Sequence, residues 1–160
     1  MALDPQVKRR AFLELTGAAV ALAASPAVAQ KFQPSQDISP LIANITQGAP
    51  IEASGVAIEL PAIAENGNSV PLHVKVASPM SATDRVEALY IFAERNPRPL
   101  VATLHFGKAA ARAEISTRMR LAGTQKVTVL AQLSGNRFRS GQLEVLVTSA
   151  ACLDEAFADT

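Results

Sequence analysis

The sequence has 160 residues, which suffices for one domain with a substantial hydrophobic core and excludes two domains of ordinary size. It contains 15 basic and 14 acidic side chains, and setting aside the three basic and two acidic residues of positions 1–29 leaves twelve of each sign. A chain this close to neutral does not favour a nucleic-acid groove or an anionic membrane surface as its partner.

The first 29 residues have the pattern of an export signal. Arg9 and Arg10 precede a weakly apolar run at residues 15–24, and Ala27-Val28-Ala29 supplies a small-residue cleavage site. This order is typical of a twin-arginine signal peptide, so we expect residues 1–29 to direct a folded protein to the periplasm and to be removed there. The apolar run is shorter than the roughly 20 residues of a membrane-spanning helix, and an uncut N-terminal anchor is the less favoured alternative.

One short helix is expected at residues 35–47, where apolar residues recur at helical spacing before Gly48 and Pro50. Beyond Pro50, apolar and polar residues alternate, which is the period of a strand with one solvent-exposed face. Residues 87–94 are apolar on both faces and predict a central strand. The expected strands are residues 56–60, 70–76, 87–94, 100–106, 113–121, 126–133 and 142–148.

Turn signals separate these strands, among them Glu65-Asn66-Gly67-Asn68, Ser134-Gly135-Asn136 and Ser140-Gly141. About seven short strands within residues 30–148 favour a mainly all-β fold, an immunoglobulin-like β-sandwich with a short N-terminal helix. A small closed barrel is the main alternative. Residues 149–160 form a C-terminal tail that bears Cys152, the one cysteine of the sequence.

Cys152 is the principal candidate for chemistry. A single thiol in an oxidising compartment is buried as a small hydrophobe, paired with another chain, or used chemically. A homodimer linked through Cys152 is therefore one alternative. Sequence alone leaves the choice among the three open.

Four segments together resemble the SoxY family, the sulfur-carrier subunits of the periplasmic Sox system that oxidises thiosulfate. Each segment is a turn or strand motif of modest specificity, but their order and spacing are characteristic. The resemblance covers residues 35–148, and the export signal agrees with it. The segments are IELP at 58–61, AENGNSVP at 64–71, IFAERNPRP at 91–99 and STRMRLA at 116–122.

The resemblance implies a covalent carrier and not an enzyme. In that family a cysteine in a flexible glycine-rich arm holds the sulfur intermediate, while separate enzymes attach, oxidise and hydrolyse it. The carrier pairs with a second β-sandwich subunit, SoxZ, and needs no cofactor. Cys152 matches the family's carrier cysteine by position, about four residues beyond the last expected strand. Four extended residues predict a reach of roughly 13 Å for the thiol.

The tail departs from the family pattern. It has none of the four glycines that flank the family's cysteine, and eight residues follow Cys152. Both differences hinder entry into a narrow enzyme tunnel, because glycine supplies the small size and the free torsions that such an arm uses. The tail is therefore expected to keep the reach of the family's arm but to be bulkier than that arm.

The charges of the tail favour two opposite outcomes for the thiol. Asp154 and Glu155 lie close to Cys152 in sequence, and negative charge disfavours a thiolate and repels an anionic sulfur substrate. A short helix capped by Ser149, over residues 150–157, would instead favour the thiolate in its first turn. Such a helix is marginal unless its apolar side chains, Leu153 and Phe157, dock on a surface.

Other polar residues give weaker signals. His73 and His105 lie on the polar sides of alternating strands without a third clustered ligand, so no metal site is expected. Several side chains of residues 112–120 share one strand face, which indicates a solvated face or a surface for a partner or an anion. They are Arg112, Arg118, Arg120, Glu114 and Ser116. Arg137-Phe138-Arg139 is too short for a nucleic-acid patch, and motifs of common enzymes are missing.

Two functions from different classes remain. The first is a periplasmic carrier whose Cys152 holds sulfur intermediates of thiosulfate oxidation, paired with a SoxZ-like subunit and visited transiently by the pathway's enzymes. The second is a diverged SoxY-like subunit that serves a structural or regulatory role without carrier chemistry. In neither case is the protein expected to be an enzyme, and modification of Cys152 separates the two.

Overall fold

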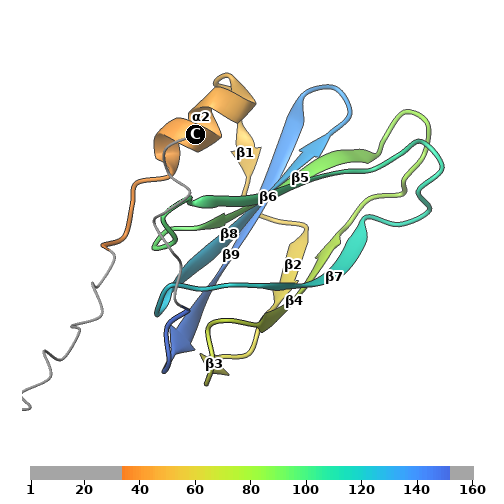
Figure 1. Cartoon of the computed structure of the whole chain (residues 1–160). Helices are drawn as coiled ribbons and strands as arrows, with labels where there is room; N and C mark the ends of the chain where they lie inside the picture. Colours follow the sequence, from red (N-terminus) through yellow and green to blue (C-terminus); the bar gives the residue numbers. More distant parts are fainter. Residues whose placement is uncertain (1–33, 152–160) are drawn as a thin grey trace, which may run out of the picture. The chain divides into compact units, whose positions relative to one another are not determined.

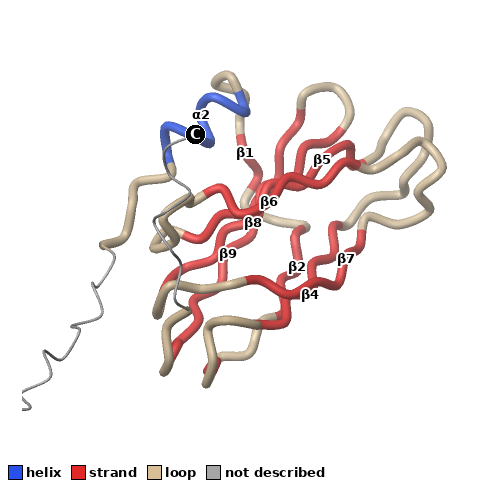
Figure 2. Tube along the Cα trace, viewed as in Figure 1, coloured by secondary structure: helices blue, strands red, loops and turns tan. Residues whose placement is uncertain are grey.

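Two β-sheets pack face to face in the computed structural model, which describes residues 34–151 (Figures 1 and 2). The expected export signal and Cys152 fall in residues 1–33 and 152–160, outside the described part. The larger sheet has the order β1-β9-β8-β5-β6, with β3 paired to β9, and the smaller has the order β2-β4-β7. The helix within the described residues, α2, spans Ser39–Thr46. The strands are β1 (Ile51–Glu52), β2 (Val56–Glu59), β3 (Ile63–Ala64), β4 (Val70–Val76), β5 (Val86–Ala93), β6 (Leu100–His105), β7 (Glu114–Met119), β8 (Gln125–Leu133) and β9 (Arg137–Val147).

The main hydrophobic core lies between the two sheets. Strand β4 shows the pattern that the sequence predicted, because Val70, Leu72, Val74 and Val76 are at most 4% exposed while the intervening side chains face outward. These side chains pack with inward residues of β5 and β8 in one cluster. Burial of each such side chain contributes about 1.5–3 kcal/mol, so the alternation itself holds the sheets together.

Strand β5 is the central strand, as its apolar pattern predicted. It pairs with β6 on one side and with β8 on the other. One face of β5 belongs to the main core, and Phe92 on the other face packs with Ile38, Leu130 and Phe138 under α2. The helix therefore covers the outer face of the larger sheet (Figure 1). The β-sandwich expected from the sequence is confirmed, and the closed barrel is not adopted by the described residues.

The helix begins later than its apolar spacing indicated, at Ser39 instead of residue 35. Ser35 and Gln36 bind the residue directly after β5 instead, with Ser35 Oγ donating to Glu94 Oε2 (2.8 Å) and Gln36 N donating to Glu94 O (2.8 Å). Asp37 Oδ1 then accepts the backbone N–H of Ser39 (2.9 Å). Hydrogen bonds from the side chain and then the backbone of Ser39 hold the pKa of the Asp37 carboxyl below its ordinary value of 3.8.

The last strand begins earlier than predicted, because Ser140-Gly141 is not a turn. Gly141 lies within β9 and pairs with Val129 of β8. A Cβ atom on Gly141 would lie 2.8 Å from Val56 O, so glycine at this position lets β2 of the smaller sheet approach β9 closely. Two further strands, β1 and β3, have two residues each and pair with β9 in parallel. Pairs that short leave no periodic signal in the sequence.

Candidate functional site

The chain leading to Cys152 leaves the larger sheet at the end of β9. We call residues 148–151 the tail root. Its first residue, Thr148, donates its backbone N–H to Ala64 O (3.0 Å) and its hydroxyl to Glu65 O (3.0 Å). The root therefore starts against the loop that joins β3 to β4.

The end of the tail root is also bonded to the sandwich. Gly67 N donates to Ser149 O (2.7 Å), and Ala151 N donates to Leu121 O (3.0 Å). Leu121 N in turn donates to Gly67 O (2.8 Å), so the two segments that bond the end of the root are also bonded to each other. Ala151 is only 7% exposed. The residue immediately before Cys152 is thus a fixed part of the folded domain.

Close packing at Gly67 makes this arrangement depend on glycine. A Cβ atom there would lie 2.4 Å from Leu121 O, 2.8 Å from Ala151 N and 3.0 Å from Ser149 O. Real Cβ atoms do not approach backbone atoms so closely, so any larger side chain at Gly67 must displace the root or the Leu121 segment. The sequence marked Gly67 only as a turn residue, because a turn pattern carries no information about what packs against the turn.

A buried polar network holds the Leu121 segment in place. Asn96 is 5% exposed, and its Nδ2 donates to Arg120 O (2.9 Å) while its Oδ1 accepts from Ala122 N (3.0 Å). Gln125 Nε2 also donates to Asn96 Oδ1 (3.1 Å). The side chain of Asn96 therefore bonds on both sides of Leu121. A buried amide with satisfied donors and acceptors specifies one position for its partners.

These contacts correct the sequence-based estimate of reach. The four residues before Cys152 do not extend the thiol by roughly 13 Å, because Ser149 and Ala151 are hydrogen-bonded to the sandwich. Nor does a helix begin directly after Ser149, since neither Ala150 nor Ala151 is helical. Cys152 itself lies outside the described residues.

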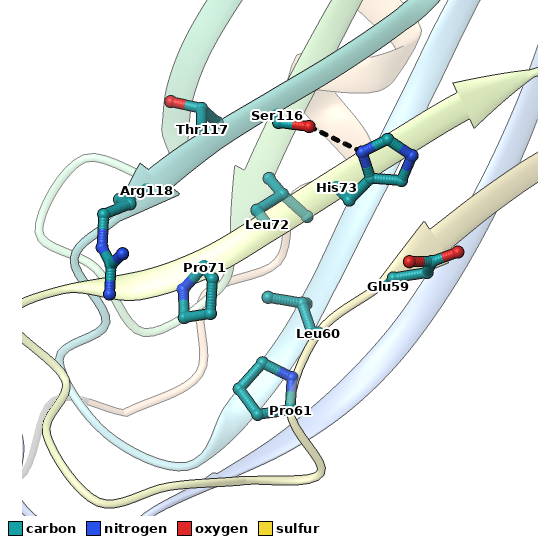
Figure 3. A pocket seen from close by; sticks show the side chains of 9 residues that line it. All are labelled: Glu59, Leu60, Pro61, Pro71, Leu72, His73, Ser116, Thr117 and Arg118. Carbon is teal, nitrogen blue, oxygen red and sulfur yellow. Dashed lines mark hydrogen bonds between the residues drawn. The ribbon is translucent and has the colours of Figure 1, made fainter.

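A groove of about 610 Å³ runs along β4, on the side of the sandwich formed by the smaller sheet (Figure 3). We call it the β4 groove. Pairing between β2 and β4 ends at Glu59 and His73, and the residues after Glu59 diverge from β4. Pro61 has no backbone N–H with which to extend the ladder. The lining residues are Glu59, Leu60, Pro61, Pro71, Leu72, His73, Ser116, Thr117 and Arg118.

His73 occupies one end of this groove on the polar face that the sequence predicted for it. Its Nδ1 lies 2.8 Å from Ser116 Oγ, and its Nε2 lies 3.3 Å from Glu114 Oε1. Both ring nitrogens thus have neighbours on β7. His105 is exposed at the end of β6. Among residues 34–151 no group of three or more His, Cys, Asp or Glu side chains is placed to hold a metal ion.

The arginines singled out in the sequence are surface residues with different surroundings. Arg118 Nε donates to Ser69 Oγ (2.7 Å), and the side chains of Arg112 and Arg120 are exposed. Arg137 and Arg139 pair with Asp84 (2.6 Å) and Glu52 (2.8 Å), and Phe138 between them is buried. The Arg137-Phe138-Arg139 segment is therefore an ordinary stretch of strand. No helix within the described residues is long and apolar enough to cross a membrane.

Comparison with known proteins agrees with these features. The model of the family "Sulfur oxidation protein SoxY" matches residues 42–152, and the matched range ends at Cys152. The solved sulfur carrier protein SoxY from Chlorobium limicola f thiosulfatophilum is similar, with 32% sequence identity over 69% of this chain and 96% of that chain, at a TM-score of 0.58. No curated protein matches at a significant level.

Superoxide reductases share the fold alone. One from Ignicoccus hospitalis covers 59% of this chain and 80% of its own, with 16% identity and a TM-score of 0.51. Another from Nanoarchaeum equitans covers 60% of this chain and 100% of its own, with 12% identity and a TM-score of 0.50. The family match spans more than half of the sequence, and the similar SoxY structure exceeds 30% identity. The chain therefore belongs to the SoxY family of sulfur oxidation proteins.

Proposed function

We propose that this protein carries sulfur intermediates of thiosulfate oxidation on the thiol of Cys152. The observation that supports the proposal best is the tail root: the sandwich bonds the chain firmly up to Ala151, and the candidate thiol follows at the next position. A carrier needs a rigid domain for partners to recognise and a thiol at its boundary. The SoxY protein from Chlorobium limicola is itself described as a sulfur carrier.

The loading step follows from the chemistry of the thiol. Cys152 loses its proton, its sulfur forms a bond to the outer sulfur of thiosulfate, and two electrons pass to an electron-accepting enzyme of the pathway. The product is a cysteine S-thiosulfonate. Hydrolysis of its terminal S–SO₃ bond by a separate enzyme releases sulfate and leaves a persulfide on the carrier. The thiolate is the attacking form, so a lower thiol pKa favours loading.

The proposal includes the location and the partners that the sequence suggested. Residues 1–29 serve as a twin-arginine signal, and the mature protein works in the periplasm. Residues 30–148 form the folded domain that pairs with a SoxZ-like β-sandwich subunit, and residues 149–160 form the tail. The enzymes of the pathway bind the loaded tail only transiently.

The variant Cys152→Ser tests the proposal in cells that depend on this protein for growth on thiosulfate. We expect loss of that growth, because an oxygen in place of sulfur cannot form the S–S bond. The control is the purified variant, which should keep the thermal midpoint of the wild type. Unchanged growth would instead indicate the second function, a structural or regulatory subunit.

A further inference from the structure

A pocket of about 460 Å³ lies on the outer face of the larger sheet, where the chain enters α2. We call it the α2 pocket. One wall comes from the start of α2 and the segment before it, and the other comes from β8, β9 and the residue after β5. The lining residues are 35–39, Ile42, Glu94, Lys126, Thr128 and Gln142. Its volume is within the range of small-molecule sites.

The hydroxyl of Thr128 is a buried polar group beside this pocket. Val127 and Val129 point into the main core, so Thr128 points to the outer face, as Leu130 does under α2. Thr128 is only 2% exposed, and its Oγ1 has no hydrogen-bond partner within residues 34–151. A buried hydroxyl without a partner costs folding free energy. A ligand that bonds to this hydroxyl would remove that cost.

Side chains of both charges lie close to this hydroxyl. The pairing of β5 with β8 continues to Ala93 and Val127. Glu94 and Lys126 adjoin that pair and therefore lie on neighbouring strands. Lys126 is exposed and forms no ion pair with any described residue. Glu94 Oε2 accepts the hydroxyl of Ser35 (2.8 Å), which leaves Oε1 to accept from a ligand.

This set of polar groups is complementary to a small zwitterion. The Lys126 ammonium, the Thr128 hydroxyl and the Gln142 side-chain amide can donate to an oxyanion. The carboxylates of Glu94 and Asp37 can accept from an ammonium group. A simple anion would be repelled by the two carboxylates, and a simple cation by Lys126. A molecule that carries both charges satisfies both halves of the pocket.

We propose that the α2 pocket binds a free α-amino acid with an aliphatic side chain. Its carboxylate lies between Lys126 and Thr128, whose hydroxyl turns into the pocket by rotation about the Cα–Cβ bond. Its ammonium group bonds to Glu94. Its side chain packs on Ile38 and Ile42, which supply the apolar part of the lining. Binding connects α2 to the sheet and stabilises the folded domain.

Isothermal titration calorimetry of the purified full chain with L-leucine tests this proposal. Isocaproate lacks the ammonium group of leucine, and isoamylamine lacks its carboxylate. Each should bind at least about tenfold more weakly than L-leucine, because charge-assisted hydrogen bonds are lost. The absence of saturable heat with L-leucine would overturn the proposal. So would equal binding of either analogue, because the pocket would then recognise only one charge.

Thr128→Val tests the role of the hydroxyl, because it removes the oxygen and keeps the shape of the side chain. It should weaken binding of L-leucine about tenfold. It should not lower the thermal midpoint of the ligand-free protein, because Oγ1 has no partner there. Thr128→Ser, which keeps the hydroxyl, should retain binding. The matched control is Thr103→Val, on β6 and outside the lining of the pocket.

Unchanged binding by Thr128→Val would contradict the proposal, and so would a fall in its thermal midpoint. Lys126→Gln should also weaken binding about tenfold, because the ligand carboxylate loses its cationic partner. Lys108→Gln removes the same charge from an exposed residue outside the lining and should leave binding unchanged. Equal binding by these two lysine variants would overturn the placement of the carboxylate.

Amide NMR spectra locate the bound amino acid. L-leucine should shift the signals of Ser39, Thr128 and Gln142, and shifts confined to residues outside the α2 pocket would overturn the proposal. The pocket uses no residue of the tail root or the tail. Cys152→Ser should therefore bind L-leucine as the wild type does. Failure of amino-acid binding and failure of the carrier function are thus distinguishable.

Discussion

At the scale of single residues, the site depends on two positions that carry no chemistry of their own. Gly67 allows the tail root to pack against the Leu121 segment, and Asn96 holds that segment through buried hydrogen bonds. Cys152 was recognisable from the sequence because a lone thiol behind an expected export signal needs an explanation. Gly67 and Asn96 were not, because close approach and burial appear only when distant segments are brought together.

Gly67→Ala tests the packing of the root. The added Cβ would lie 2.4 Å from Leu121 O, so the backbone has to shift, and we expect a loss of about 1–3 kcal/mol in the free energy of unfolding. Denaturant titration measures it. Gly107→Ala is the matched control, because a Cβ at Gly107 has nothing within 4 Å. Equal stability of the two variants would show that the root does not pack as described.

At the scale of elements, the strands with strong alternation were predictable and their ends were not. Strand β4 has the predicted bounds, and β5 is central as its apolar pattern indicated. The helix and β9 begin at other residues than predicted, because contacts with distant segments outweigh the local sequence pattern. Ser35 and Gln36 bind Glu94, directly after β5, instead of extending α2, and Gly141 allows the close approach of β2 instead of making a turn.

We predict that the hydrogen bonding at the start of α2 is lost at acidic pH. The pKa of Asp37 is lower in the folded protein than its ordinary value of 3.8, because Ser39 donates hydrogen bonds to the carboxylate. Its stabilising contribution is therefore fully present above pH 3.8 and is lost as the pH falls through the folded pKa. The amide NMR signal of Ser39 should report this titration. Asp37→Asn should abolish it, and a pH-independent Ser39 signal in the wild type would contradict the hydrogen bond between Ser39 and the Asp37 carboxylate.

At the scale of the whole molecule, the two packed sheets form a scaffold, and the proposed carrier thiol follows its last described residue, Ala151. The root joins the end of β9, in the larger sheet, to the segment after β7, in the smaller one. It therefore lies at the seam between the two sheets. The fold class followed from seven short strands, whereas the anchoring of the root required the three-dimensional arrangement.

Mass spectrometry of the intact protein and of its tail peptide, purified from cells grown on thiosulfate, tests the carrier assignment most directly. We predict a mass increase that corresponds to an S–SO₃ group or a persulfide, located on Cys152 and removed by a reductant. Protein from cells grown without reduced sulfur compounds should lack it. An unmodified Cys152 thiol under both conditions, in a protein that cells need for thiosulfate oxidation, would contradict the account.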